Sequence, residues 1–253
     1  MGSNLALAAP FDAAFRSTDI DQIRGREFSL VICAGLSAAK WIANREPLAD
    51  REKMESLVKA VGEAKIEEFV VISTVDVYPD PREVDEDTEI DRNALSPYGA
   101  HRQEFEVFVE RRFPKPRIIR LPGLFGPGLR KNAIFDLLHD HELEKLNPSS
   151  RYQWFDIRRL WDTIQRVREA DLTEINISTE PLAMSEIIES NFPGADLEES
   201  APSVYYDMRS RHAEMLGGRS GYILSKNEVL QDISTFVRGV REGRVSCGLP
   251  YPT

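Results

Sequence analysis

The sequence is poor in cysteine and has no long apolar run. Its two cysteines, Cys33 and Cys247, are too few for a disulfide framework and form no spacing typical of a metal site. This scarcity fits a reducing compartment, so we expect a cytoplasmic protein without a bound metal. No apolar run is long enough to cross a membrane, and the chain begins without the basic start and long apolar core of a signal peptide. We therefore expect no membrane partner.

Basic residues are also in the minority. The sequence has 32 Lys and Arg against 42 Asp and Glu, which gives a net charge of -10. Such a chain repels a phosphate backbone, so we expect no nucleic-acid partner, although a local basic pocket for a small anion is still allowed. With 253 residues, 42% of them hydrophobic, the chain can bury the core of one large α/β domain with a smaller appendage.

Strand-like and helix-like patterns alternate along much of the chain. Continuous apolar runs end near Ala34, Thr74 and Leu121, and such runs are typical of strands that are buried on both faces. Helical patterns separate them, and this alternation predicts a parallel, doubly wound sheet. The predicted strands are 12–16, 29–34, 68–74, 117–121, 154–157 and 174–178, and the predicted helices are 47–64, 98–113, 132–143, 159–170, 184–190 and 227–240.

The helix near residue 98 carries a tyrosine and an arginine one turn apart. Ser96 and Pro97 are a helix-start signal, and Tyr98, Arg102 and Phe105 then fall on one apolar stripe. A cation beside a tyrosine favours the phenolate and lowers a pKa that starts near about 10, which suits the phenol to proton exchange near neutral pH. The same pair also fits the border of an ordinary amphipathic helix, so it does not decide the function alone.

Several separated blocks follow one another in a specific order. Residues 31–35 form a strand with a small-residue turn, residues 71–78 form a hydroxyl-bearing strand, and Thr74 precedes Tyr98 by 24 residues (98 − 74). In these blocks the chain resembles the extended short-chain dehydrogenase/reductases, also called the NAD-dependent epimerase/dehydratase family, whose Tyr-x-x-x-Lys corresponds to Tyr98 through Arg102. Further blocks that resemble the family's loops and its nucleotide-sugar segment lie at 120–128, 176–187 and 207–217.

The resemblance implies a fold and an activity. The expected fold is a Rossmann-like doubly wound parallel sheet with a small carboxy-terminal α/β substrate-binding region. The expected activity is NAD(P)-dependent oxidation, reduction or epimerisation of a sugar-like or nucleotide-sugar alcohol or ketone, with the nicotinamide carrying the hydride. A homodimer is also expected, because the tyrosine helix of the family often packs in dimers. The cofactor-binding domain is expected at 1–125 and 150–180, the substrate-binding region at 126–149 and 181–242, and a loose tail at 243–253.

The resemblance also assigns residues to roles. The Thr74 hydroxyl would bind the substrate oxygen while Tyr98 transfers the proton, with Arg102 as the third catalytic residue. The cofactor-binding residues would be Gly2, Ser3, Asn4, Arg16, Ser17, Asp19, Ile20, Ala34, Gly35, Ser73, Tyr98, Arg102, Pro122 and Leu124. The substrate-binding residues would be Asp76, Gly123, Arg209 and Arg211, although the basic cluster of the last two with His212 also fits a solvated helix start.

Three departures from the family pattern bear on activity. Arg102 replaces the lysine, and arginine keeps the charge but is effectively never deprotonated, so it cannot join a proton relay. Gly123 stands where many members have asparagine, which removes a hydrogen-bonding group from the sugar site unless a tight turn needs the glycine. The Gly-x-x-Gly-x-x-Gly fingerprint is missing, and only Gly2 resembles its last glycine.

The family's first strand comes just before this fingerprint, so a chain that begins at its last glycine lacks that strand as well. In the strand order 3-2-1-4-5-6 the first strand is central, so its loss leaves two neighbours with unpaired edges. We expect either an amino-terminally truncated chain or a rearranged strand order that closes the gap. With Gly2 as the last glycine, Arg16 and Ser17 suit a 2′-phosphate and favour NADP over NAD, unless Arg16 is a solvated loop residue.

The remaining polar residues suggest no second site. His101 points about 60° away from the Arg102 stripe and is expected at the surface or behind the site. His139 and His141 lie two residues apart, a poor metal spacing. The acids from Glu83 to Asp91 are expected in a solvated loop. The competing function is a non-catalytic NAD(P)-binding sensor or interaction protein with a degenerate active site.

Overall fold

The computed structural model describes residues 1–195 and 197–248. These residues form two compact units, and three stretches that the sequence assigned to the cofactor-binding domain, 122–125, 150–163 and 177–180, belong to the second of them. The predicted tail lies partly outside the described residues, because the description ends at residue 248. The first unit consists of residues 1–121 and 164–176, and the second consists of residues 122–163 and the chain from 177 onward.

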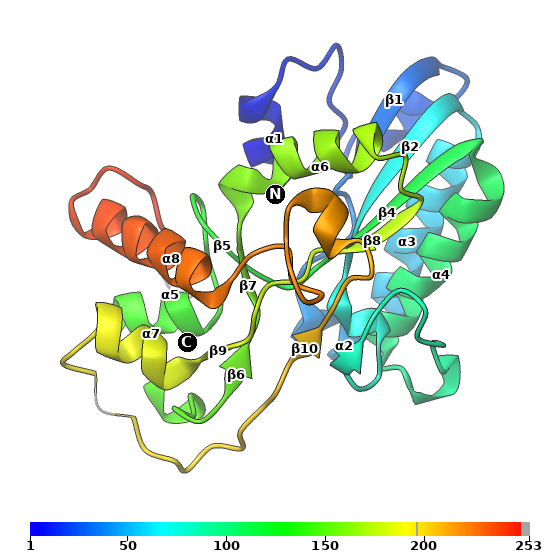
Figure 1. The fold of residues 1–253 in the computed structure, drawn as a ribbon. Helices are drawn as coiled ribbons and strands as arrows, with labels where there is room; N and C mark the ends of the chain where they lie inside the picture. Colours follow the sequence, from blue (N-terminus) through cyan, green and yellow to red (C-terminus); the bar gives the residue numbers. More distant parts are fainter. Residues whose placement is uncertain (196, 249–253) are drawn as a thin grey trace. The chain divides into compact units, whose positions relative to one another are not determined.

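A four-stranded parallel sheet forms the centre of the first unit (Figure 1). Its register places Ile32 opposite Val70 and Ile72 opposite Ile119, so the apolar runs of neighbouring strands lie side by side. The predicted Rossmann-like parallel sheet is therefore confirmed. In order across the sheet the strands are β1 (Glu27–Cys33), β2 (Lys65–Thr74), β4 (Lys115–Leu121) and β8 (Glu174–Asn176).

Helices cover both faces of this sheet (Figure 1). On one face, apolar side chains of α3 and α4, among them Met54 and Phe105, pack against Phe69 and Val71 of β2. On the other face lies α6, which contributes the buried Ile164. The other elements of the first unit are α1 (Gly2–Ala8), η1 (Ile20–Ile23), α2 (Lys40–Arg45), α3 (Pro47–Gly62), η2 (Val75–Val77), β3 (Arg82–Val84), η3 (Arg92–Ala94), α4 (Pro97–Arg112) and the later part of α6 (Leu160–Glu169).

Strand β1 lies at the edge of the sheet as far as the chain is described, because β2 is its only strand partner there. The predicted strand at 12–16 is wrong: this stretch is a loop, and Phe15 packs edge-on against Phe28 of β1 with ring centroids 6.1 Å apart. Small residues and an aspartate give the stretch little strand propensity. Among the described strands none closes the gap beside β1, so the rearranged strand order is not seen.

Buried ionic clusters lie on both faces of the sheet. On the α4 face, Glu106 binds Arg120 through Nη2 at 2.9 Å, and the Arg120 Nη1 donates to the Tyr78 hydroxyl at 2.9 Å. On the α6 face, Glu68 binds Arg117 at 2.8 Å and Arg168 at 2.9 Å. Although burial raises the pKa of Glu68, hydrogen bonds from the two arginines hold it below its usual value. The pairing is needed because a buried charge without a partner would carry a large desolvation penalty.

A third buried ion pair joins helix α3 to helix α4. Arg102 of α4 is 2% exposed and binds both carboxylate oxygens of Asp50 of α3, with Nη2 3.1 Å from Oδ1. His101 Nδ1 lies 2.7 Å from the same carboxylate, so His101 is buried rather than at the surface. Burial alone would raise the pKa of Asp50, but the hydrogen bonds from Arg102 and His101 hold it below its usual value.

The start of α4 is fixed closely against the segment that follows β2. The Ser96 hydroxyl caps the helix by accepting from the Gly99 N–H at 3.4 Å, and Asn44 Oδ1 of α2 accepts from the Tyr98 N–H at 2.9 Å. A Cβ on Gly99 would lie 2.2 Å from the carbonyl oxygen of Asp76. Only glycine therefore allows the helix to approach this backbone so closely.

The second unit is built from short elements. Strands β5 and β7 pair in parallel, β6 and β9 pair antiparallel, and Phe236 of α8 packs against Phe125 of β5 at 5.8 Å between centroids. None of the described helices of the protein is long and apolar enough to cross a membrane. The elements are β5 (Gly123–Phe125), α5 (Ala133–His139), η4 (Leu143–Lys145), β6 (Arg151–Tyr152), β7 (Trp154–Asp156), η5 (Ile157–Arg159), the start of α6, β9 (Leu182–Ala183), α7 (Met184–Asn191), β10 (Asp207–Met208), η6 (Ala213–Leu216) and α8 (Lys226–Arg241).

Replacing Gly99 by alanine should destabilise the protein by about 1–3 kcal/mol, because the added methyl group overlaps the Asp76 carbonyl. Urea unfolding measures the change. The matched control is Gly62→Ala, also in a helix, where the nearest atom to the new Cβ is 3.6 Å away in the Phe108 ring. The control should lie within about 0.5 kcal/mol of the original protein. Equal effects of the two substitutions would contradict the close approach.

The Asp50→Asn substitution should destabilise the protein by about 3–5 kcal/mol, because it leaves the Arg102 charge buried without its partner. The control is Glu104→Gln, which breaks the exposed α3–α4 pair with Arg51 and should cost less than about 1 kcal/mol. Because the pKa of Asp50 is lowered in the folded protein, its contribution is present above the unfolded value of about 3.9 and is lost as the pH falls through the folded pKa. Unfolding curves of both variants at neutral and acidic pH test this: the Asn variant should lose less stability on acidification.

Candidate active site

Thr74 and Tyr98 come together at the carboxyl end of β2. Thr74 is the last residue of the strand, and its hydroxyl accepts from the Asp76 N–H at 3.2 Å and lies 3.4 Å from Asp76 Oδ2. Tyr98 is on the first turn of α4, which the glycine contact brings against Asp76, and the nearby Thr74 side chain lowers the pKa of its phenol. The ends of parallel strands are where such sheets bind ligands.

Burial dominates the ionisation of Tyr98, which is only 7% exposed. Desolvation raises the pKa of Tyr98 above its ordinary value, against the opposing effects of Arg102, Thr74 and Lys40, and Asp76 raises it further. The expected lowering by Arg102 is therefore outweighed. At neutral pH the phenol holds its proton and can donate it.

Arg102 lies beside Tyr98 on the packed side of α4, as the sequence predicts, but its charge already has a partner. Its guanidinium lies over the face of the Tyr98 ring, 4.0 Å from the centroid, and Nη2 donates to the Ser37 carbonyl at 2.6 Å. Asp50 accepts from Nη1 and Nη2, Nη1 also donates to the Tyr98 carbonyl at 3.3 Å, and Nε is buried without a partner among the described residues. The charge is thus paired with Asp50, so Arg102 both holds α4 against α3 and lowers the pKa of Tyr98 from over its ring.

The other predicted cofactor residues of the first unit are spread over several segments. Gly2, Ser3 and Asn4 form the first turn of α1, and Arg16 and Ser17 lie in an exposed loop ahead of Asp19 and Ile20. Ala34 and Gly35 follow β1 directly. Ser73 is 6% exposed and its hydroxyl donates to Glu106, so this side chain is held inside the sheet cluster instead of facing a ligand.

A dinucleotide fits these residues only in part. The Thr74 and Tyr98 hydroxyls supply polar groups for its nicotinamide end beside the end of the sheet. No strand-to-helix turn of the described chain carries the clustered glycines that let a backbone approach a pyrophosphate. The nicotinamide end of the site is therefore better defined here than the pyrophosphate end.

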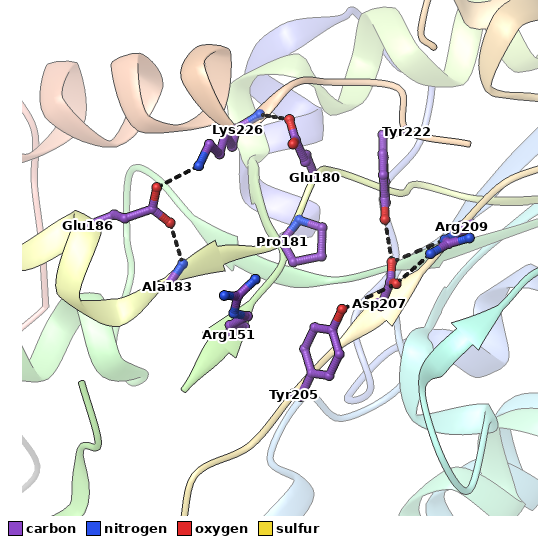
Figure 2. A pocket seen from close by; sticks show the side chains of 10 residues that line it. All are labelled: Arg151, Glu180, Pro181, Ala183, Glu186, Tyr205, Asp207, Arg209, Tyr222 and Lys226. Atoms are coloured by element: carbon purple, nitrogen blue, oxygen red, sulfur yellow. Dashed lines mark hydrogen bonds and ion pairs between the residues drawn. The ribbon is translucent and has the colours of Figure 1, made fainter. Parts of the chain in front are cut away.

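The second unit contains a cavity of about 480 Å³ (Figure 2). On one side Tyr222 and Arg209 bind Asp207, at 2.5 Å and 2.9 Å, and burial with the hydrogen bond to Asp207 raises the pKa of Tyr222 to about 12. On the other side Lys226 binds Glu186 at 2.8 Å. Arg151 is exposed, and Figure 2 shows it without a carboxylate partner among the lining residues. The lining residues are Arg151, Glu180, Pro181, Ala183, Glu186, Tyr205, Asp207, Arg209, Tyr222 and Lys226.

The predicted residues of the second unit divide between this cavity and other places. Arg209 lines the cavity, whereas Arg211 donates to the His212 ring at 3.0 Å outside it. Pro122 is buried, and Gly123 and Leu124 begin β5. A Cβ on Gly123 would lie 3.0 Å from the Gln153 carbonyl oxygen and from the Trp154 ring, so close strand packing, not a tight turn, accounts for this glycine.

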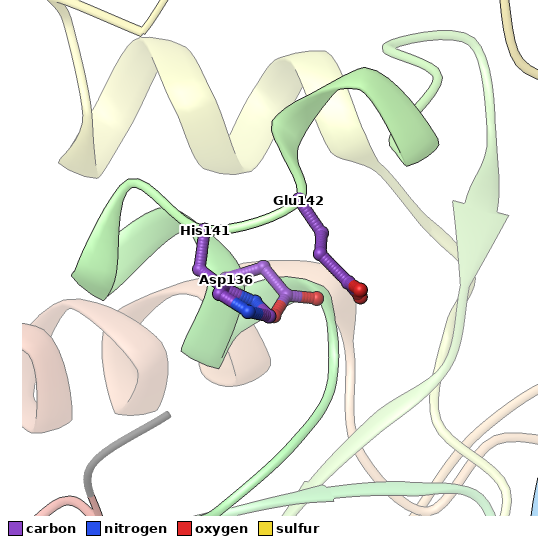
Figure 3. A group of neighbouring side chains, drawn as sticks. All are labelled: Asp136, His141 and Glu142. Atoms are coloured by element: carbon purple, nitrogen blue, oxygen red, sulfur yellow. The ribbon is translucent and has the colours of Figure 1, made fainter. Parts of the chain in front are cut away.

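One further group of polar side chains deserves comparison with a metal site. Asp136, His141 and Glu142 each offer a ligand atom within 4.8 Å of the others (Figure 3). His141 Nδ1 already lies 3.2 Å from Asp136 Oδ1, Glu142 binds Lys145, and burial raises the pKa of Asp136. These pairings satisfy the group internally, so we assign no metal to it, and the expected lack of a metal stays a prediction.

The sequence did not reveal the roles of several polar residues. Asp50 and Glu106 carry no local signal, because their partners lie far along the chain. Glu86, expected in a solvated loop, is 8% exposed and accepts from the Asn176 N–H at 2.8 Å. Lys40, which binds Asp76 at 2.6 Å beside Thr74, was also missed.

Comparisons with known proteins agree with this fold. A comparison with curated protein sequences finds no match. Among solved structures, the NAD-dependent NDP-hexosamine 5,6-dehydratase TunA is 20% identical, with a TM-score of 0.64 over 90% of this chain and 80% of that one. RMD from Pseudomonas aeruginosa, solved with NADPH, is 15% identical (TM-score 0.65, 91% and 89% covered). MoeE5, solved with UDP-glucose and NAD, is 18% identical (TM-score 0.62, 91% and 85% covered).

At such low sequence identities, the solved structures support the fold of this chain but not its function. The sequence model described as the NAD dependent epimerase/dehydratase family matches residues 28–170, more than half of the chain. This range includes β1, the Thr74 and Tyr98 site and the loop after β4. The chain therefore belongs to the NAD-dependent epimerase/dehydratase family.

Proposed function

We propose that this protein is an NAD(P)-dependent oxidoreductase or epimerase that acts on a sugar-like or nucleotide-sugar alcohol or ketone. The observation that carries the proposal is the placement of the Thr74 and Tyr98 hydroxyl side chains near each other at the carboxyl end of β2. Family membership supports it, because the pair stands on the segment that matches the family.

In this proposal Tyr98 transfers a proton to or from the substrate oxygen. Its raised pKa keeps the phenol protonated at neutral pH, so donation to a ketone oxygen is the favoured direction. Thr74 hydrogen-bonds the same oxygen and orients it toward the phenol. A bound nicotinamide would supply or accept the hydride.

The cavity of the second unit is proposed to bind the anionic part of the substrate. Arg209 and Lys226 already have carboxylate partners, which leaves Arg151 as the basic lining side chain with the most freedom to bind an anion. Tyr205 and Tyr222 add polar hydroxyls and aromatic surface. The neighbour solved with UDP-glucose and NAD suggests a nucleotide sugar as the first probe.

The choice of cofactor stays a prediction. Several solved neighbours hold NAD and one holds NADPH. Arg16 and Ser17 are exposed and accessible to a 2′-phosphate, which keeps NADP as the mild preference.

A second candidate is a non-catalytic NAD(P)-binding sensor. The observation that favours it is the burial of Arg102 in the pair with Asp50, which occupies the motif's own cation with a carboxylate. Binding of a nicotinamide dinucleotide without turnover would favour this candidate over the enzyme.

The Tyr98→Phe variant should lose at least about 100-fold in turnover, because the proton donor is removed while the ring packing on Arg102 is kept. The assay follows the consumption of NADH by a nucleotide-sugar ketone, with NADPH in parallel, because this is the direction in which Tyr98 donates its proton. Tyr152→Phe, a half-buried tyrosine of the second unit, is the control and should keep the original rate. An unchanged rate for Tyr98→Phe would exclude this residue as the proton donor.

The Arg151→Ala variant should bind UDP-glucose about 10- to 100-fold more weakly, since a hydrogen bond to a charged group contributes about 1.5–3 kcal/mol. Isothermal titration calorimetry measures the Kd, and the difference between variants should shrink as salt is raised. Arg244→Ala, an exposed arginine near the end of α8 that is outside the cavity lining, is the control. Equal Kd values for both variants would remove Arg151 from the substrate site.

A further inference from the structure

An ammonium group lies beside the Thr74 and Tyr98 pair although the tyrosine helix itself has none. Lys40 Nζ is 2.6 Å from Asp76 Oδ1, and the other oxygen of the same carboxylate is 3.4 Å from Thr74 Oγ1. The Lys40 side chain is 47% exposed and that of Asp76 20%, so the pair is at the accessible border of the site. The contacts run from Lys40 through Asp76 and Thr74 to the Tyr98 phenol.

The position of Lys40 is fixed by the same helix that holds the tyrosine backbone. Lys40 is the first residue of α2, and Asn44 follows one turn later on the same face of this helix. Asn44 accepts the hydrogen bond of the Tyr98 N–H at 2.9 Å. Helix α2 thereby places an ammonium group and the start of α4 against the same segment.

Arg102 has a different role. Its guanidinium is over the ring face, 4.0 Å from the centroid, where it lowers the Tyr98 pKa while it is paired with Asp50. An arginine is also effectively never deprotonated, whereas an ammonium group can exchange its proton.

We propose that Lys40 is the positioning cation of this active site and acts on Tyr98 through Asp76 and Thr74. The proposal rests on the proposed function of Tyr98 and adds to it the source of the missing ammonium group. Lys40 balances the Asp76 carboxylate, which would otherwise oppose formation of the phenolate, and holds it where it meets the Thr74 hydroxyl.

The charged groups around the phenol define what each variant should do. They are Arg102 from α4, with Asp50 behind it, Asp76 after β2 and Lys40 from α2. Lys40→Met should move the Tyr98 titration to higher pH, because Asp76 is left unbalanced. Asp76→Asn should move it to lower pH, and the double variant should return close to the original. Lys40→Arg should change it little.

NMR of the chain labelled at the tyrosine Cζ carbons measures this titration without any turnover, and the signal of Tyr98 is identified by its loss in Tyr98→Phe. Lys65→Met is the matched control, since Lys65 forms an exposed ion pair with Glu27 in the same unit. In the turnover assay Lys40→Met should lower kcat about tenfold with little change in KM, and Lys40→Arg should restore most of it.

Shifts of the Tyr98 titration in one direction for both Lys40→Met and Asp76→Asn, or no shift in either, would overturn the proposal. A gain in rate for Arg102→Lys together with an unchanged rate for Lys40→Met would also overturn it. If the original protein shows no turnover, the proposed function fails, while the titration still decides the role of Lys40.

Discussion

The buried pair of Asp50 and Arg102 is the interaction on which the site depends. It joins α3 to α4 with both carboxylate oxygens engaged, and the guanidinium supports the Tyr98 ring from one face. Two buried charges contribute little net stability as a pair, yet loss of either partner is costly because the other stays desolvated. The pair therefore fixes the register of α4 more than it stabilises the fold, and this register sets the position of the tyrosine.

A second constraint acts at the start of the same helix. Gly99 lets the first turn of α4 approach the Asp76 carbonyl, and Asn44 holds the Tyr98 N–H from α2. Together with the Asp50 pair, these contacts hold α4 at three points, which are Arg102, the backbone of Tyr98 and Gly99. A phenol held this firmly loses little further freedom when it meets a substrate, which is the requirement for efficient proton transfer.

The four strands of the parallel sheet could be predicted because an apolar run is a local signal of a buried strand. Thr74 and Tyr98 were assigned through the resemblance to the family, which includes their spacing of 24 residues (98 − 74). The role of Arg102 could not be predicted, since its place on the stripe does not reveal that Asp50, on another helix, faces it. Ser73 was misjudged for the same reason, because its partner Glu106 is fixed only by the tertiary packing.

Pairing and burial together separate structural cations from functional ones in this protein. Arg102, Arg117 and Arg120 are almost fully buried, and each has a carboxylate that satisfies its charge, so none can bind a ligand without first leaving that partner. Lys40 and Arg151 differ, because both reach solvent at the border of a site. A motif comparison weighs residues by sequence position and so selected Arg102. Burial and pairing instead favour Lys40 as the functional cation, because a desolvated charge must keep its partner. Lys40 lies 58 residues before Tyr98 in the chain (98 − 40), and only the fold brings the two together.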